Sequence, residues 1–212
     1  MRLYSYFRSS AAYRVRIALN LKRLDFEYVA VHLTKGEQRG ELYRSLNPQA
    51  LVPTLADELG TFTQSLAIIE YLDETHPEPP FLPGDAAGRA RVRALAAIVA
   101  CDIHPLNNLR ALQYLKETLG VSEEAKNAWY RHWIELGLSA LEAQVAASPR
   151  TGLFCHGDTP TVADICLVPQ LANARRLPIP LEAYPTLLRI ESNCQKMDAF
   201  ANAAPARQPD AA

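Results

Sequence analysis

The chain has 212 residues, of which 49% are hydrophobic and 21% charged, a size that suits one large domain or two small ones. Its formal net charge of −1 at pH 7, without a basic tail or polybasic run, argues against nucleic acid as a partner. The longest apolar run, residues 95–101, is too short to span a bilayer, and the N-terminus carries no apolar signal-peptide core, so we expect a cytoplasmic protein with no membrane partner.

The first third of the chain predicts a small α/β arrangement. Residues 2–7 alternate between apolar and polar side chains, and residues 24–33 are rich in aromatic and β-branched side chains, so both segments favour strands. Two further strands flank a tight turn at residues 58–60. The expected order is β-α-β-α-β-β-α, with strands at 2–7, 24–33, 51–57 and 60–64 and helices at 10–23, 34–46 and 65–76.

A segment with four prolines, residues 76–88, separates this part from a helical remainder. Beyond it, Val92, Leu95, Ala96 and Val99 recur at the spacing of a buried helix face. Further helices are expected at 105–119, 123–147, 161–176 and 184–200, followed by a loosely ordered tail at 203–212. We therefore predict two domains, residues 1–80 of the α/β class and residues 86–212 of the all-α class.

Three short motifs carry local information. Val52-Pro53 begins a strand after a loop, where the proline is either an ordinary edge residue or a cis residue that leaves the Val52 backbone free to pair with an extended peptide ligand. Thr161 and Asp164 have the spacing of a capping box, which starts a helix. Ser65, next to Gln64, is expected at the N-cap of the helix 65–76, where it either only caps or also binds a carboxylate.

The junction between the first strand and the first helix combines two hydroxyls with three cations. Ser9 and Ser10 lie at the expected helix start, where backbone N–H groups are unpaired and the helix dipole is positive. Arg8, Arg14 and Arg16 add full charges nearby. These residues fit a site for an anion such as a thiolate. They fit equally a helix capped by Ser9 with solvated arginines.

The four cysteines do not supply that thiolate. Cys101, Cys155, Cys166 and Cys194 are widely spaced, form no CxxC pair and make no zinc pattern with the few histidines. We interpret them as buried, reduced thiols. Any thiol chemistry must then come from a molecule outside the chain, and no metal is expected.

The sequence resembles the zeta class of glutathione transferases, the glutathione-dependent maleylacetoacetate and maleylpyruvate isomerases. The segments that carry the resemblance run almost end to end: "LYSYFRSS", "RVRIAL", "LNPQALVPTL", "FTQSLAIIEYLDET", "TVADICLVPQLANA" and "RQPD". Ala11 and Tyr13 replace the cysteine and the tryptophan of the family's Ser-Ser-Cys-x-Trp signature, so whatever that cysteine contributes is not required here. The resemblance implies a thioredoxin-like N-terminal domain, a helical C-terminal domain and a homodimer.

The resemblance also implies roles for individual residues. Ser9, with Ser10 beside it, takes the position of the serine that faces the glutathione thiol. The implied glutathione contacts are Ser9, Ser10, Gln38, Val52, Gln64, Ser65, His104, Asn108 and Arg110; the implied catalytic residues are Ser9, Ser10, Arg8 and Arg176, and the implied substrate contacts are Arg8, Arg110 and Arg176. His104 replaces a glutamine of other members and either tunes a ligand contact or packs on its helix. Arg175 is expected to be a solvated surface charge.

The implied reaction is the cis-trans isomerisation of a maleyl keto acid, either maleylpyruvate or maleylacetoacetate, to its fumaryl isomer in aromatic compound or tyrosine catabolism. Glutathione is the cofactor: its thiolate adds to the double bond, the bond rotates, and the thiolate is eliminated. A glutathione-conjugating transferase acting on α-halo acids or other electrophiles is the alternative, and a non-catalytic binding protein of the same fold is a weaker one. A thiol-disulfide oxidoreductase is disfavoured because no cysteine lies at the start of the helix 10–23.

Overall fold

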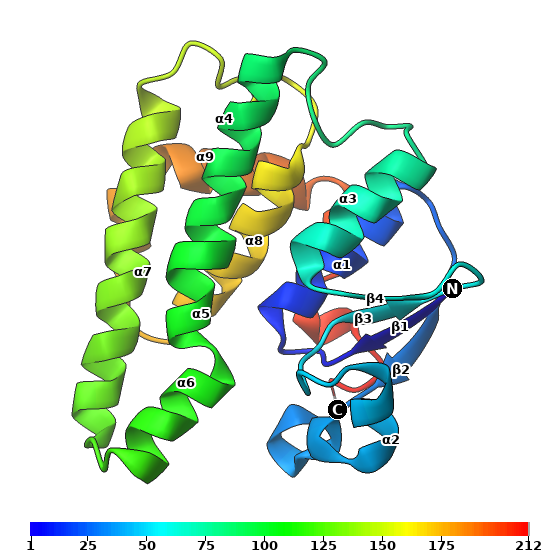
Figure 1. Cartoon of the computed structure of the whole chain (residues 1–212). Helices are drawn as coiled ribbons and strands as arrows, with labels where there is room; N and C mark the ends of the chain where they lie inside the picture. Colours follow the sequence, from blue (N-terminus) through cyan, green and yellow to red (C-terminus); the bar gives the residue numbers. More distant parts are fainter. Residues whose placement is uncertain (212) are drawn as a thin grey trace. The chain divides into compact units, whose positions relative to one another are not determined.

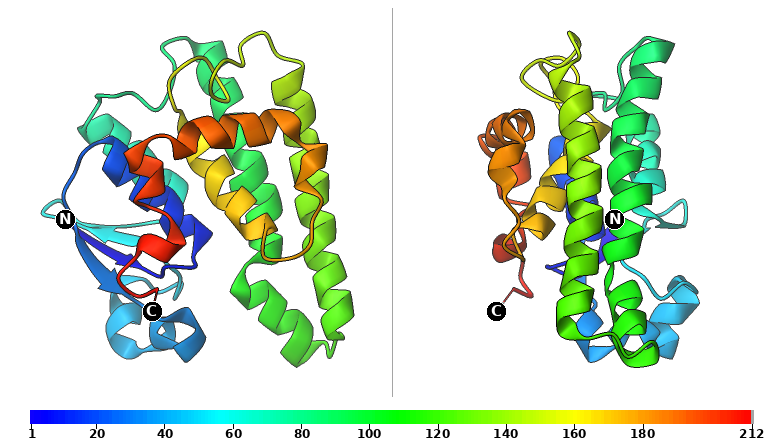
Figure 2. Two further views of the ribbon diagram at one scale, coloured as in Figure 1. Left: turned by 180° about the vertical axis from the view of Figure 1, so that it is seen from behind. Right: turned by 90° about the vertical axis from the view of Figure 1, so that its left-hand side faces the viewer.

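The computed structural model describes residues 1–211 and divides into two compact units (Figures 1 and 2). The first unit comprises Met1–Pro80 and the chain from Gln195 onward, and the second unit comprises Phe81–Cys194. The predicted boundary after residue 80 coincides with the end of the first segment. The structure differs in the C-terminal segment, which groups with the first unit instead of with the predicted domain 86–212.

The first unit is built on a four-stranded mixed sheet of order β2-β1-β3-β4. Strand β1 runs parallel to β2 and antiparallel to β3, which is antiparallel to β4. The predicted order β-α-β-α-β-β-α is confirmed by the elements β1 (Arg2–Ser5), α1 (Ser10–Leu21), β2 (Glu27–Ala30), α2 (Glu41–Leu46), β3 (Thr54–Ala56), β4 (Thr61–Thr63) and α3 (Ser65–Thr75), with 3-10 turns at Leu33–Lys35 and Glu37–Arg39. Helix α10 (Asp198–Ala201) and a 3-10 turn at Pro205–Arg207 complete the unit.

The alternation along β1 gives the sheet two packed faces. Leu3 is fully buried opposite Leu55 of β3, on the face that α1 and α3 cover (Figure 1). Tyr4 points to the opposite face, where its ring lies 5.9 Å from the ring of Tyr43 on α2. Each face therefore has a core of its own, as period-two side-chain direction requires.

The C-terminal segment is fixed to the first unit by a buried cation, Arg16. Its side chain is 1% exposed and donates hydrogen bonds to the Ala203 carbonyl at 2.9 Å, the Ser5 hydroxyl at 3.1 Å and the Phe7 carbonyl at 3.2 Å. Removal from water lowers the pKa of Arg16 to about 10, a value at which the guanidinium is still charged at neutral pH. The expectation that Arg16 is solvated or binds an external anion is therefore wrong.

Asp210 closes the same arrangement from the end of the chain. Its carboxylate accepts a hydrogen bond from the Phe7 backbone N–H at 3.0 Å and another from the Tyr28 hydroxyl at 2.6 Å. Burial, together with this bond to Asp210, raises the pKa of Tyr28. The prediction of a loosely ordered tail is wrong for residues 203–211, because the Ala203 carbonyl and the Asp210 carboxylate accept hydrogen bonds from groups near the start of the chain; residue 212 lies outside the described residues.

The second unit is formed mainly by helices, in the order α4 (Ala86–Ala97), a π-helical turn Ile98–Ile103, α5 (His104–Asn107), α6 (Leu109–Gln113), a π-helical turn Tyr114–Thr118, α7 (Glu123–Ala146), α8 (Val162–Ala174), a 3-10 turn Leu181–Ala183 and α9 (Pro185–Gln195). Helix α8 packs against α4 and is buried over most of its length. The predicted capping box is confirmed: the Thr161 N–H donates to the Asp164 carboxylate at 2.8 Å, and the reciprocal bond is also present. The same carboxylate accepts from the Cys155 N–H at 2.8 Å.

Three predicted helices are broken in the structure. The helix expected at 34–46 is two 3-10 turns, Leu33–Lys35 and Glu37–Arg39, followed by α2. The helix expected at 105–119 is interrupted at Asn108, which has extended backbone angles and caps α6 through its side chain. The helix expected at 184–200 is two helices, because α9 ends at Gln195 and α10 begins at Asp198. Apolar periodicity does not reveal such breaks, since both halves keep a helical pattern.

The cysteines follow the expectation with one exception. Cys155, Cys166 and Cys194 are buried, whereas Cys101 is exposed. Among the described residues, no helix combines the length and apolar character that a membrane span needs.

We expect Asp210→Asn to lower the free energy of unfolding by about 1–3 kcal/mol, because the amide has no charge and can accept only one of the two hydrogen bonds. Urea denaturation of the purified protein measures this loss. Asp25→Asn is the matched control, since it makes the same change at an exposed position of the first unit and should stay within about 0.5 kcal/mol of the parent. An equal loss in both variants would contradict the assigned role of Asp210.

Candidate functional site

Ser9 is the N-cap of α1 and lies at the positive end of that helix. Its Oγ accepts a hydrogen bond from the Ala12 N–H at 3.2 Å, and its backbone N–H donates to the Tyr6 carbonyl at 2.9 Å. A hydroxyl that accepts one hydrogen bond keeps its own proton to donate. The half-buried Ser9 can therefore cap the helix and donate to an anion at the same time, so the two readings of this residue do not exclude each other.

The residues around Ser9 differ in exposure. Arg8 is exposed, whereas Ser10, the first residue of α1, is buried. Ala11 and Tyr13, where the chain departs from the family signature, are both buried, and the Tyr13 hydroxyl donates a hydrogen bond to the Phe200 carbonyl at 3.4 Å. Both departures therefore face the interior of the first unit.

Arg14 connects α1 to the beginning of α3. Its side chain is 1% exposed, and its guanidinium donates to the Ser65 hydroxyl at 3.2 Å. Arg14 is therefore not the solvated charge that was one expectation from the sequence. A buried cation behind the N-terminus of α3 adds to the positive potential of the helix dipole, a combination that favours a carboxylate.

The N-cap of α3 is Gln64 and not Ser65 as predicted. Gln64 has φ +68° and ψ 117°, a conformation that side-chain-bearing residues rarely adopt. Its exposed side chain donates to Gln49 Oε1 at 2.8 Å. Strained backbone of this kind occurs preferentially at ligand-binding positions.

Two further residues predicted to bind glutathione lie in the first unit. The Val52-Pro53 bond is cis, as one of the two sequence alternatives requires, and Val52 is buried just before β3. Gln38 lies in the 3-10 turn Glu37–Arg39, where it is buried and donates to the Leu33 carbonyl at 3.3 Å. The roles of Gln38 and Val52 toward a ligand stay predictions.

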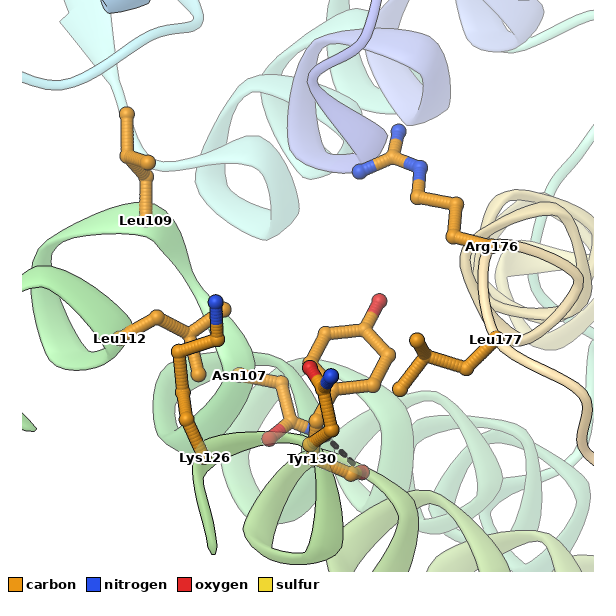
Figure 3. Close-up of a pocket in the computed structure, with 8 residues that line it drawn as sticks. Asn107, Leu109, Leu112, Lys126, Tyr130, Arg176 and Leu177 are labelled. Atoms are coloured by element: carbon orange, nitrogen blue, oxygen red, sulfur yellow. Dashed lines mark hydrogen bonds between the residues drawn. The ribbon is translucent and has the colours of Figure 1, made fainter. Parts of the chain in front are cut away.

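The second unit contains a pocket of about 210 Å³, which Figure 3 shows. It lies among α5, α6, α7 and the end of α8, and it is lined by Asn107, Leu109, Leu112, Lys126, Asn127, Tyr130, Arg176 and Leu177. The break between α5 and α6 helps to shape it. Helix α5 is held on α7 by hydrogen bonds from Asn107 to the Tyr130 carbonyl at 3.0 Å and from Trp129 to the Leu106 carbonyl at 2.8 Å.

Of the four predicted site residues in the second unit, one lines this pocket. Arg176 lines it, whereas His104, Asn108 and Arg110 are not among its lining residues in the described part of the chain. The Asn108 side chain accepts from the Ala111 N–H at 3.1 Å and so caps α6, while Arg110 is exposed and His104 is half-buried. Their ligand roles stay predictions.

The neighbouring arginines of the end of α8 have different partners. Arg175 forms two hydrogen bonds with the Glu191 carboxylate, at 2.6 and 2.5 Å, and is therefore a paired residue instead of a solvated charge. Arg176 lies close enough to Tyr130 to act on its titration: burial raises the pKa of Tyr130, and the charge of Arg176 opposes that shift. Arg175 is therefore fixed by an ion pair with Glu191, whereas Arg176 lines the pocket.

Sequence reasoning missed Lys126 and Tyr130. They lie four residues apart on α7, so they share a helix face, which is the one signal that connects them. That signal is weak, because the sequence does not show which face of α7 lines a pocket.

Comparisons with known proteins agree with this architecture. Residues 3–80 match the family described as "Glutathione S-transferase, N-terminal domain", and residues 127–190 match "Glutathione S-transferase, C-terminal domain". A maleylpyruvate isomerase from Ralstonia sp. is 52% identical over the whole of both chains.

Two solved structures are similar over the full length of this chain. One is described as a holo structure of maleyl pyruvate isomerase, a bacterial glutathione S-transferase of the zeta class, with 52% identity, a TM-score of 0.98 and complete coverage of both chains. The other is a maleylacetoacetate isomerase from Anaeromyxobacter dehalogenans 2CP-1 with glutathione bound in its active site; it is 47% identical, with a TM-score of 0.88, and covers 100% of this chain and 97% of that one.

We expect Gln64→Gly to be more stable than Gln64→Ala by about 1 kcal/mol, because glycine adopts φ +68° without the strain that a Cβ imposes. Both variants lose the same hydrogen bond to Gln49, so their difference isolates the backbone. Chemical denaturation of the two variants side by side measures it. If the alanine variant is the more stable one, the backbone at this position is not strained.

Proposed function

Because this chain belongs to the zeta class of the glutathione S-transferase family, the class of maleylpyruvate and maleylacetoacetate isomerases, we propose that it isomerises a maleyl keto acid to its fumaryl isomer with glutathione as cofactor. The first unit is the thioredoxin-like part of this fold, and the second unit is its helical part. The observation that carries the proposal is the hydroxyl of Ser9, which caps α1 as an acceptor and can still donate a hydrogen bond to a sulfur anion.

The residues of the first unit fit glutathione as a ligand. The buried Arg14 behind Ser65, together with the N-terminus of α3, supplies the positive potential that a γ-glutamyl carboxylate needs. In the proposal, Ser65 and Gln64 hold this end, the Val52 backbone holds the cysteinyl part and Ser9 holds the sulfur. The remaining proposed contacts are Ser10, Gln38, His104, Asn108 and Arg110.

When bound, glutathione supplies a nucleophilic sulfur that adds to the cis double bond and leaves once the bond has rotated. The task of Ser9 is to keep that sulfur ionised. A free thiol has a pKa of roughly 8.5, so only a few per cent is ionised at pH 7. Lowering this pKa by about 2 units requires roughly 2.7 kcal/mol, which a hydrogen bond from the Ser9 Oγ–H and the end of α1 supply in order of magnitude.

The cations of the site have a second task. A maleyl keto acid carries carboxylates, and negative charge develops on its keto oxygen as the double bond is attacked. The exposed guanidinium groups of Arg8 and Arg176 are suited to these oxygens, because a planar guanidinium grips a carboxylate through two parallel hydrogen bonds. We assign them to substrate binding and charge stabilisation, with Arg110 as a further contact.

The resemblance to this class also supports a cytoplasmic homodimer, which we include in the proposal. The compartment is further supported by the cysteines, all four of which are free thiols, as is usual in a reducing environment.

We expect the purified protein to convert maleylpyruvate or maleylacetoacetate to the fumaryl isomer in many turnovers per molecule of glutathione, because the isomerisation regenerates the cofactor. A reaction with the keto acid in large excess over glutathione measures this ratio. Product formation that stops at one equivalent of glutathione would contradict the proposal and would identify a conjugating transferase.

We expect Ser9→Ala to raise the pKa of the bound thiol by about 1 unit and to lower kcat/KM near pH 7 by up to about tenfold, because the sulfur loses its hydrogen-bond donor but keeps the end of α1. Ultraviolet titration of the bound thiolate measures the shift. Ser9→Thr keeps both hydroxyl and cap and should titrate like the parent.

The matched control is Ser122→Ala, which removes the equivalent N-cap of α7, where the hydroxyl accepts from the Ala125 N–H at 3.1 Å. It should cost about 1 kcal/mol of stability without changing the titration. A thiolate titration that Ser9→Ala leaves unchanged would remove Ser9 from its role.

A further inference from the structure

We infer that the pocket of the second unit binds the carboxylate at the far end of the keto acid, the end remote from the double bond, and that Lys126 acts there with Arg176 as a specificity-determining cation. This inference rests on the proposed function. It adds a binding residue that the family resemblance does not supply.

The pocket has the charge that a carboxylate requires. In Figure 3, Lys126 of α7 lies on one side and Arg176 lies on the other, with the Tyr130 side chain between them. Within the described part of the chain, none of its lining residues carries a carboxylate. Two full positive charges therefore face a cavity that contributes no opposing charge from its own walls.

The ammonium group of Lys126 is held at the pocket wall by Glu123. It donates to the Glu123 carboxylate, which also accepts from Lys116 at 3.3 Å. Glu123 is not among the lining residues of the pocket, so a ligand in the pocket meets the Lys126 ammonium and not the carboxylate that holds it. An ammonium has three donors, and one bond to Glu123 leaves further donors for a ligand carboxylate.

The two lysines of this network differ in a useful way. The side chain of Lys126 is 19% exposed, whereas that of Lys116 is 61% exposed. Only Lys126 is among the lining residues of the pocket. Substitution of Lys116 therefore removes one cation that pairs with Glu123 and leaves the lining of the pocket unchanged.

The apolar part of the pocket fits the body of the same ligand. Leu109, Leu112 and Leu177 line it, and such walls exclude water and strengthen the attraction between a carboxylate and the cations. The distal ends of the two candidate substrates differ by one methylene. A lysine on a flexible four-carbon stem can follow that difference better than a rigid guanidinium.

The test is the binding of an analogue in which the carbon–carbon double bond is saturated, so that no isomerisation is possible. Two forms are compared with glutathione present: the diacid, and the monoacid in which a methyl group replaces the distal carboxylate. We expect Lys126→Met to weaken the diacid about tenfold and to leave the monoacid within about twofold of the parent, as measured by titration calorimetry. Lys126→Arg should restore the preference for the diacid.

Lys116→Met is the matched control and should change neither affinity. The inference is overturned if Lys126→Met weakens both analogues equally, if it weakens neither, or if Lys116→Met gives the same loss. Failure of the proposed function is a different result, because it appears as absent turnover of the unsaturated keto acid by the parent enzyme, whereas the binding titration needs no turnover.

Discussion

The guanidinium of Arg16 joins the segment at the end of β1 and before α1 to a segment 187 residues after Arg16 in the chain. It donates to Ser5 of β1, to the carbonyl of Phe7 in the loop before α1, and to Ala203 near the end of the chain. Asp210 binds the N–H of the same Phe7. The N–H and the carbonyl of Phe7 are thus both hydrogen-bonded, which fixes the backbone just before Arg8 and Ser9 at the N-terminus of α1. Lysine, with one compact charge, has no planar fork to span these acceptors.

The arginines of the chain differ in burial. Arg14 and Arg16 are buried under the first helix, and Arg175 is paired with Glu191. Arg8 and Arg176 are exposed. Burying a charge is costly unless its hydrogen bonds are replaced, and the carbonyl and hydroxyl acceptors around Arg16 replace them. The buried guanidinium groups also place positive charge behind the helix ends at which an anion is proposed to bind.

The sequence predicted the order of the elements, the capping box at Thr161 and the start of α1, because each of these depends on neighbouring residues. It did not predict the break at Asn108 or the order of the C-terminal segment, because both depend on distant partners. The arginines show the same limit. The sequence does not distinguish Arg14, Arg16 and Arg175 from solvated arginines, because their hydrogen-bond acceptors come from residues distant in sequence. Lys126 was missed for this reason too, since a pocket between helices leaves no local pattern.

The grouping of the chain from Gln195 onward with Met1–Pro80 has a consequence for biosynthesis. The strands and helices of residues 1–80 are synthesised before the helical region, whereas the acceptor of Arg16 at Ala203 and the carboxylate of Asp210 are synthesised after it. While the ribosome is still translating the helical region, the nascent sheet lacks both partners. The first unit therefore completes its hydrogen bonding only after Asp210 has been synthesised, and two segments on either side of the helical region together form one compact unit.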